Sequence, residues 1–252
     1  MKLLTLARDL RRRRARERQR LFTAEGVRAV EELVRSGLPV RGVLVAPQLA
    51  DAPRGTALIG SLRTAGVEIV EIGPLDFASA AETESPQGVL AVAEIPERTL
   101  ETLVIPERAR IVVLDAVQDP GNVGTILRTS AALGAAAAVA LPGTVDLWNA
   151  KVVRSAMGAS FHFPVLSTTW VELDLFRQQN AVALWGADAA GAPLDTLHPP
   201  ARLALVVGNE GAGLSQDARQ RIDTLAALPI GSVVESLNVA VATGIFLYQL
   251  RQ

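Results

Sequence analysis

Five side chains in three short segments of this chain have types and positions suited to chemistry. The segments are DPGNVGTILRT (119–129), GNEGAG (208–213) and ESLNVAVATG (235–244). The first supplies the amide of Asn122 and, six residues further on, the guanidinium of Arg128. The second supplies the carboxylate of Glu210, and the third supplies the hydroxyl of Ser236 and the amide of Asn238. These residues are candidates for contacts with a ligand, since loops at neighbouring strand ends build a crevice.

Taken one at a time, each segment also has an ordinary structural explanation. Asn122 sits where a helix N-cap belongs, and Arg128 would then be a solvent arginine on the same helix. Glu210 would be a solvated turn acid, in a glycine turn that lacks the G-x-G-x-x-G order and the Walker lysine. Ser236 is the expected N-cap of the last helix, with Asn238 in its first turn. Local pattern alone leaves both interpretations open.

The elements that must position these residues alternate between strand and helix over the C-terminal half. The predicted strands are 111–117, 135–141, 163–166, 181–188, 203–208 and 226–230, and the predicted helices are 122–134, 149–160, 170–180 and 236–250. The strand at 111–117 is nearly continuously apolar, as in buried parallel sheets. This repeated β–α pattern predicts an α/β fold with an open, mostly parallel sheet that is covered by helices on both faces.

The N-terminal half predicts a second, small α/β domain. Helices are expected at 24–37 and 55–66, and strands at 40–47, 67–72 and 88–95. A charged stretch between Pro96 and Pro106 is typical of a linker. The expected division is a basic segment, a small domain, a linker and a large domain, at 1–22, 23–95, 96–109 and 110–252.

Composition narrows the class of protein. The chain has 252 residues, 49% of them hydrophobic, which permits a substantial core. No apolar run is long enough for a membrane span, and the first ten residues do not form a secretory signal, so a cytoplasmic protein is expected. With no cysteine and two histidines, no metal site is expected. Net charge is −1, but eight arginines cluster within residues 8–20, where they can neutralise phosphates unless they form only a solvated helix face.

The order and spacing of the three segments are more specific than any one of them. N-x-G-x-x-x-R at 122–128, G-N-E-G-x-G at 208–213, and L-P-I followed by S-L-N-V-A-V-A within 228–242 closely resemble the three motifs of the SpoU/TrmH family of RNA 2′-O-ribose methyltransferases, in the SPOUT class. The pattern E-G-x-R-x-V-E-E at 25–32 is similar to the start of the L30e-like substrate-binding domain of many members. Departures are small: Thr125 stands where alanine is common, and L-P-I where I-P-M is common.

The resemblance implies features that periodicity does not show. It implies a deep trefoil knot at the C-terminal end of the sheet, with S-adenosylmethionine bound bent in the knot, mostly through backbone groups. Carried onto this chain, the implied cofactor contacts are Gly208, Gly213, Leu228, Ile230 and Leu237, together with Leu184 and Gly186 at another strand end.

The implied chemistry is an in-line displacement in which a ribose 2′-oxygen attacks the sulfonium methyl group and a neutral thioether leaves. Arg128 would lie beside that hydroxyl. Because a free guanidinium has a pKa above about 12, we expect Arg128 to clamp phosphate and stabilise oxyanion charge rather than to act as the base. Glu210 would orient Arg128 or the ribose, Asn122 and Asn238 would fix ribose and loop geometry, and Ser236 is a secondary candidate.

The implied partners are RNA and a second copy of the chain. Ribosomal RNA, most simply 23S rRNA, is favoured because such an N-terminal domain more often accompanies ribosomal substrates than tRNA. The implied RNA contacts are Arg11, Arg12, Arg13, Arg14, Arg28 and Arg128. A homodimer through the C-terminal domain is expected because the last helix is apolar on nearly all sides. A tRNA methyltransferase, an antibiotic-resistance rRNA methyltransferase and an inactive RNA-binding paralogue stay open, whereas a dehydrogenase lacks its glycine fingerprint.

Overall fold

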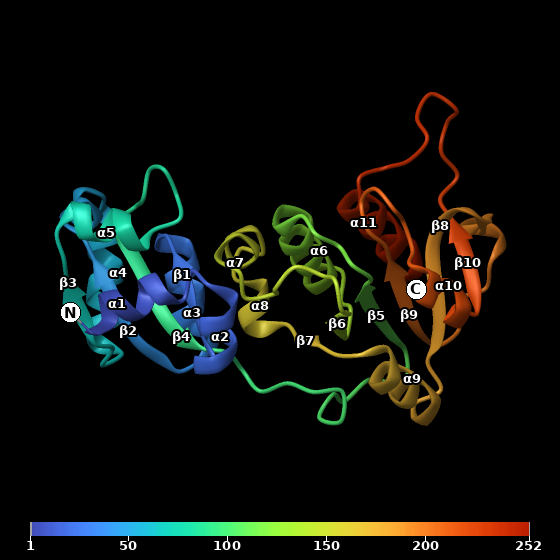
Figure 1. Cartoon of the computed structure of the whole chain (residues 1–252), viewed down its shortest axis with the longest axis horizontal. Coiled ribbons are helices and arrows are strands. Elements are labelled where there is room, and N and C mark those ends of the chain that lie inside the picture. The colour runs from blue at the N-terminus through green and yellow to red at the C-terminus, as the bar shows by residue number, and fades with distance from the viewer. Residues whose placement is uncertain (1, 252) are drawn as a thin grey trace. The chain divides into compact units, whose positions relative to one another are not determined.

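The computed structural model describes residues 2–251 and divides the chain into two compact units. The first unit combines Met1–Glu97 with Trp148–His162, and the second combines Arg98–Leu147 with Phe163–Gln252 (Figure 1). Each unit has its own sheet. The chain therefore passes from one unit to the other three times, after residues 97, 147 and 162.

A six-stranded parallel sheet forms the centre of the second unit, as the β–α pattern predicts. Its strands are β5 (Ala109–Leu114), β6 (Ala137–Ala140), β7 (Val165–Ser167), β8 (Ala183–Pro193), β9 (Arg202–Val207) and β10 (Thr224–Ala227), in the order β10-β8-β9-β5-β6-β7. From β5 the chain builds outward through β6 and β7, and the later strands then lie on the other side of β5. The loops after β5 and β9 thus flank a topological switch point, where α/β folds bind ligands.

Helices cover both faces of this sheet. They are α6 (Pro120–Ala132), α9 (Trp170–Gln179), α10 (Gln216–Arg221) and α11 (Val239–Leu250), with a 3₁₀ turn at Leu194–Thr196. Ile111 and Val113 of β5 belong to the core that contains apolar residues of α9 and α10. The alternate residues Val112 and Leu114 are also fully buried, and they point to the opposite face because strand side chains alternate. The fold class expected from the sequence is confirmed, and the trefoil knot stays a prediction.

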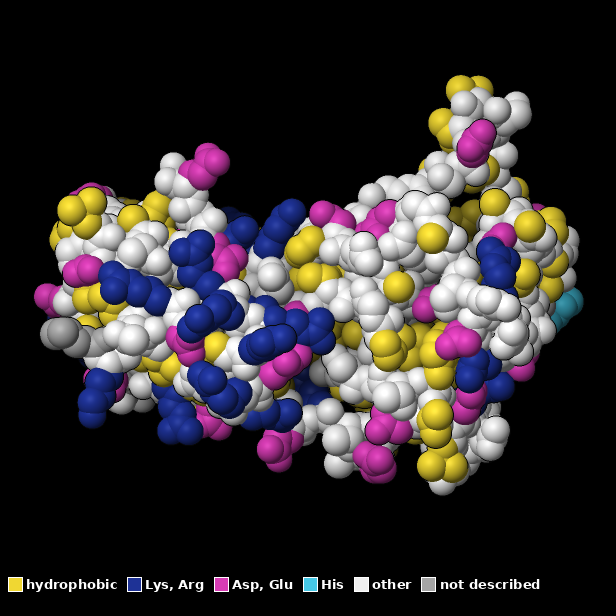
Figure 2. Space-filling model, viewed as in Figure 1, with side chains coloured by type: hydrophobic (Ala, Val, Ile, Leu, Met, Phe, Trp, Pro, Cys, Tyr) yellow, Lys and Arg dark blue, Asp and Glu magenta, His cyan; other side chains and the backbone are white. Residues whose placement is uncertain are grey.

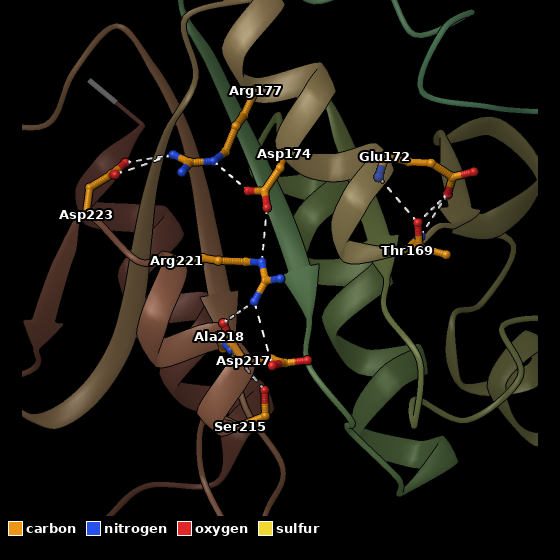
Figure 3. Close-up of polar contacts among 9 residues, drawn as sticks. All are labelled: Thr169, Glu172, Asp174, Arg177, Ser215, Asp217, Ala218, Arg221 and Asp223. Atoms are coloured by element: carbon orange, nitrogen blue, oxygen red, sulfur yellow. Dashed lines mark hydrogen bonds and ion pairs between the residues drawn. The ribbon is translucent and has the colours of Figure 1, made fainter.

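Charged side chains tie α9 to α10 and to the start of β10 (Figure 3). Arg177 donates to Asp174 at 2.9 Å and to Asp223 at 3.2 Å, and Arg221 donates to the other oxygen of Asp174 at 3.0 Å. The guanidinium of Arg221 also lies 5.4 Å from the centre of the Trp170 ring. These half-buried pairs hold α9 and α10 together on one face of the sheet.

The first unit is built on a four-stranded mixed sheet in the order β1-β4-β2-β3. Its strands are β1 (Leu21–Glu25), β2 (Val40–Val45), β3 (Ile69–Glu71) and β4 (Val89–Glu94), and β2–β3 is the parallel pair among its three strand pairings. Its helices are α1 (Lys2–Asp9), α2 (Arg13–Gln19), α3 (Val27–Ser36), α4 (Pro53–Thr64), α5 (Pro74–Ala80), α7 (Ala150–Ser155) and α8 (Ala159–His162), with a 3₁₀ turn at Pro47–Asp51. This is the small α/β domain that the sequence predicts.

The basic N-terminal segment is an integral part of the first unit rather than an appendage. Leu4, Ala7 and Leu10 are buried in its hydrophobic core. The Arg16 guanidinium is buried as well and donates to the carbonyl of Leu10 at 2.7 Å. The sequence did not predict β1 either, because all five of its residues are buried and no alternation marks it.

The helix expected at 149–160 is two short helices, α7 and α8, and they pack on the first unit. The break lies at Met157 and Gly158, whose φ angles of 51° and 89° end α7 in the left-handed region. The ring of Trp148 lies 4.5 Å from that of Phe22 in β1. Phe161 lies 5.6 Å from the same ring. Helical spacing was visible in the sequence, but the identity of the covered core was not.

The expected linker has no helix or strand between Ile95 and Arg108, but most of it is fixed to the second unit. Leu100 and Ile105 are buried in that unit's core. The Arg98 guanidinium donates to the carbonyl of Phe163. The chain therefore leaves the first unit at Glu97 and joins the second at the next residue.

Candidate active site

A cleft of about 640 Å³ lies at the carboxyl end of β9 in the second unit. Its walls are the end of β9, the glycine turn 208–213, the segments 228–230 and 235–239, and one face of α11. Two of the three motifs therefore line one cleft although they are about 20 residues apart in the chain. The lining mixes apolar side chains such as Leu237 and Phe246 with glycine backbone, which suits a small organic ligand.

The glycine turn is shaped by Asn209. Its backbone pairs with Gly213 through two hydrogen bonds of 2.9 Å, and its side-chain oxygen accepts from the N–H groups of Gly211 and Ala212. A Cβ atom on Gly208 would lie 2.3 Å from the backbone of Gly213, so only glycine fits there. The Asn209 amide also donates to the carbonyl of Ala116 at 3.0 Å, which joins this turn to the loop after β5.

Glu210 connects the glycine turn to the start of α6. One carboxylate oxygen accepts from the backbone N–H of Asp119 and from the side-chain amide of Asn122, both at 3.0 Å. The other oxygen accepts from the N–H of Gln118 at 3.2 Å. The carboxylate thus receives three donors from residues 118–122 and holds the two loops together.

Asn238 extends this connection to the third motif. Its side-chain N–H donates to the Asn122 amide oxygen at 3.0 Å, while its own oxygen accepts from the N–H groups of Ala240 and Val241. Asn238 is therefore the N-cap of α11. One chain of hydrogen bonds, from Glu210 through Asn122 to Asn238, joins all three motifs.

Two caps differ from the sequence prediction. Asn238 caps α11 in place of Ser236, which precedes the helix, is exposed and lines the cleft. Asp119 caps α6 in place of Asn122, and it accepts from the N–H of Asn122 at 2.8 Å. In both motifs several cap-forming residues lie within three positions, and only the folded backbone selects among them. Freed from the cap, the Asn122 side chain reaches Glu210 and Asn238.

The environment of Glu210 favours its charged form. Burial raises the pKa of this carboxyl, but the hydrogen bonds from Asn122 and from backbone N–H groups outweigh that effect. The net result is a pKa for Glu210 below the ordinary value. Glu210 is accordingly a carboxylate at neutral pH, suited to orienting donors and poorly suited to storing a proton.

Comparison with known proteins identifies the family. The SpoU rRNA Methylase family matches residues 109–248, which is more than half of the chain. The chain belongs to the SpoU rRNA methylase family. The MRM3-like substrate binding domain matches residues 5–91, within the first unit and including part of α1.

Full-length relatives of this SpoU protein are known. It is 35% identical over 240 residues to the Bacillus subtilis 23S rRNA (guanosine(2553)-2′-O)-methyltransferase RlmP, covering 95% of this chain and 92% of that protein. The solved structure of the SpoU methyltransferase AviRb from Streptomyces viridochromogenes, in complex with AdoMet, matches with a TM-score of 0.90, 28% identity, and coverage of 100% and 97% of the two chains. An AdoMet-bound rRNA methyltransferase from Sinorhizobium meliloti matches with a TM-score of 0.84, 28% identity, and coverage of 99% and 94%.

Most of the SpoU cofactor residues that the sequence suggested line the cleft. These are Gly208, Gly213, Leu228, Ile230 and Leu237. Leu184 and Gly186 do not line it. Leu184 is fully buried in the core, and a Cβ on Gly186 would meet three apolar side chains between 2.5 and 3.0 Å away. The volume, the apolar walls and the exposed glycine backbone fit S-adenosylmethionine.

Arg128 does not line the cleft. It is exposed on α6, one and a half turns beyond Asn122, and makes no hydrogen bond or ion pair with another described residue. Its guanidinium is thus available to an external anion.

The other arginines suggested for RNA binding lie in the first unit. Arg11 donates to a backbone carbonyl, and Arg12 and Arg13 donate to carboxylates. Arg14 and Arg28 are exposed and make no hydrogen bond or ion pair with a described residue. Basic side chains gather over this unit on the face drawn in Figure 2.

Sequence reasoning missed several residues of the SpoU site. Asn209 was read only as part of a glycine turn, and Asp115 was absorbed into a strand. Asp115 is buried and accepts from the backbone N–H of Ser215 at 2.7 Å, which fixes the far end of the same turn. The acidic residues Asp188 and Glu235 also line the cleft. A polar residue directly after a buried strand was the available signal for Asp115.

No group of three or more histidine, aspartate or glutamate side chains within residues 2–251 is arranged to hold a metal ion. In the same range, no helix has the length and apolar character needed to cross a bilayer.

Proposed function

We propose that this protein transfers the methyl group of S-adenosylmethionine to a ribose 2′-hydroxyl of 23S rRNA. The observation that carries the proposal is the hydrogen-bond chain from Glu210 through Asn122 to Asn238. It assembles the three SpoU motifs at the edge of a cleft with the size and lining for the cofactor. Support for the substrate comes from the full-length similarity to RlmP, whose name specifies a guanosine 2′-hydroxyl of 23S rRNA.

When bound in the cleft, S-adenosylmethionine supplies an electrophilic methyl group on a sulfonium. Gly208, Gly213 and the backbone near Leu228 to Ile230 would hold the cofactor, with Leu237 against its apolar surface. Glu210 would keep the cleft wall and the first motif in register. This positioning role of Glu210 is consistent with the hydrogen bonds that its carboxylate accepts from three N–H groups.

Arg128 would act on the RNA rather than on the cofactor. Its planar guanidinium can bind a phosphate beside the target ribose and stabilise negative charge as the 2′-hydroxyl loses its proton. Asn122 and Asn238 would position the ribose through side-chain amide groups that the hydrogen bond between these two residues does not use. Ser236, exposed at the cleft, is a secondary candidate for the same task.

We further propose a homodimer through the second unit, working in the cytoplasm. The support is an exposed apolar row on α11, formed by Val241, Ile245 and Tyr248. These residues recur every three to four positions and so share one face of the helix. A second copy of the same helix would cover them. Light scattering at micromolar concentration should give twice the chain mass, and a fully active monomer would contradict the dimer.

Methylation mapping tests the function. Purified protein, S-adenosylmethionine and 23S rRNA transcribed in vitro should yield one 2′-O-methylated nucleotide, located by mass spectrometry of nuclease fragments. The same reaction with tRNA is the matched comparison. Methylation of tRNA alone would overturn the choice of substrate. Calorimetry that detects no binding of S-adenosylmethionine or its demethylated product would overturn the whole proposal.

A further inference from the structure

A second cleft lies in the first unit and has a volume of about 620 Å³. It is bordered by the beginnings of α3 and α4, by the loop before β4, and by α7 with the turn that follows it. Arg28, Arg54 and Arg154 all line it, and we call it the arginine cleft. Arg154 lies outside residues 5–91, the range matched by the substrate-binding domain, so one wall comes from the excursion 148–162.

Arg154, which lines this cleft, carries an unsatisfied donor. Its Nη1 atom is buried and has no hydrogen-bond partner among residues 2–251. A buried guanidinium N–H without an acceptor is unfavourable by itself, so a movement of the Arg154 side chain that brings this donor to a ligand oxygen in the cleft would be stabilised. This observation does not depend on helix dipoles or on surface charge.

The carboxylates of the cleft are already occupied. Arg54 is paired with Glu31 through two contacts of 2.9 and 3.2 Å to its two oxygens. Glu25 is buried and accepts from the backbone N–H of Glu82 at 2.9 Å and from the hydroxyl of Thr83. An incoming anion would therefore meet Arg154 and the exposed Arg28 without displacing an internal ion pair.

The remaining walls suit a flat apolar group beside that anion. Val27 and Met157 line the cleft, and the Met157 side chain is 42% exposed. The Gln87 amide oxygen accepts from the N–H of Val27 at 2.9 Å, which leaves its N–H₂ group to face a ligand. α3 and α4 both begin at the cleft, which adds positive potential from their first turns.

We propose that the arginine cleft binds one unpaired nucleotide of the RNA substrate, with its phosphate on Arg154 and Arg28 and its base against Val27 and Met157. The proposal rests on the RNA substrate of the proposed function. Arginine forks match phosphate geometry, and the volume lies within the range of small-ligand pockets. A base must leave its stack to enter such a cleft, which is how single-stranded loops of RNA are recognised.

Charge supports RNA over an uncharged partner. The first unit contains 16 Lys and Arg against 13 Asp and Glu, a net charge of +3, whereas the second contains 9 against 13, a net charge of −4. The two values add to the whole-chain charge of −1. A phosphate backbone would be attracted to the unit that contains the arginine cleft.

The test compares three variants of the full chain. Arg154→Gln removes the phosphate contact, Met157→Ala removes the base contact, and Arg63→Gln changes an exposed arginine of α4 outside the cleft. Binding of in-vitro-transcribed 23S rRNA is measured by fluorescence anisotropy at several salt concentrations, and S-adenosylmethionine binding by calorimetry. Arg154→Gln should weaken RNA binding about tenfold and lower the salt slope by about 1. Met157→Ala should weaken RNA binding with the slope unchanged.

The controls separate this proposal from the proposed function. Arg63→Gln should bind RNA like the parent, and all three variants should bind S-adenosylmethionine like the parent. If the parent methylates 23S rRNA while Arg154→Gln and Met157→Ala keep parental RNA affinity, the arginine cleft is not an RNA site and the proposed function stands. If the parent neither binds nor methylates 23S rRNA, both proposals fall. Because Met157 is exposed, its variant keeps the test decisive even if Arg154→Gln fails to fold.

Discussion

At the scale of single residues, the proposed function gives Glu210 the task of organising the site rather than reacting. Glu210 has a lowered pKa, so it is negatively charged throughout the neutral range. For a carboxyl whose pKa is depressed on folding, the stabilisation is complete above the unfolded pKa and is lost as pH falls through the folded value. The hydrogen bonds between Glu210 and residues 118–122 should therefore be intact at pH 7 and should weaken only at acidic pH.

Glu210→Gln tests this directly. The variant keeps an acceptor oxygen but loses the charge that strengthens three hydrogen bonds, so it should melt at a lower temperature than the parent at pH 7. As the pH falls below the ordinary glutamate pKa of about 4.3 and through the lower pKa of folded Glu210, the gap between the two melting temperatures should narrow. Calorimetric scans from pH 3 to pH 8 measure it. A gap that stays constant down to pH 3 would show that the charge of Glu210 contributes nothing.

Arg128 presents the opposite case, a residue whose side chain makes no hydrogen bond or ion pair with any side chain or backbone group within residues 2–251. Arg128→Ala should reduce methyl transfer by about 10²- to 10³-fold, the usual loss when one donor to a developing oxyanion is removed. S-adenosylmethionine affinity should stay within twofold, since Arg128 does not line the cleft. Arg128→Lys should also be poor because lysine lacks the planar fork. Equal losses of rate and of cofactor affinity would place Arg128 in the cofactor pocket instead.

At the scale of elements, α11 is held at its start by one side chain. Asn238→Ala removes the cap and the bond to Asn122, and it should lower the free energy of unfolding by about 1 kcal/mol. Ser236→Ala, two residues earlier and outside the helix, is the matched control and should change stability little. Urea unfolding measures both. A larger loss for the Ser236 variant would mean that Ser236 is the cap.

The sequence predicted elements well where the signal is local. The apolar run at 111–117 and the glycine turn at 208–213 lie within three residues of β5 and of the observed loop. Choices decided by distant partners were not predicted. Asn209 reaches Ala116, 93 residues away, and Glu210 reaches Asn122, 88 residues away. No pattern within either segment specifies those bonds.

At the scale of the whole molecule, the division of labour between the units can be tested with a fragment. The cut belongs after Glu97, since a fragment starting near residue 108 would lose Leu100 and Ile105 from its core. Residues 98–252 should bind S-adenosylmethionine but should methylate 23S rRNA poorly. Trp148→Ser and Phe161→Ser should be included to keep the fragment soluble, because the partner ring of both, Phe22, is absent. Full activity of the fragment would show that the first unit does not select the RNA.

The sequence did not predict that residues 148–162 pack in the first unit. The helical spacing of this excursion is the same whichever core it covers, and its neighbours at Leu147 and Phe163 belong to the second unit. The ring contacts of Trp148 and Phe161 with Phe22, and the contact of His162 with Glu32 at 3.6 Å, reveal where it packs. A prediction from one sequence has no access to that choice.

The same excursion imposes an order on folding during synthesis. The ribosome releases the chain from its N-terminus, yet the first unit lacks Trp148 and Phe161 until residue 162 has emerged, about 65 residues after residue 97. At ordinary translation rates of roughly 5–20 residues per second, the stretch that ends at residue 97 waits about 3–13 seconds for the aromatic neighbours of Phe22. By then β5 and β6 of the second unit have also been made. The first unit therefore cannot complete its core until residues 148–162 have been made. The two units then complete their folding over the same period rather than one after the other.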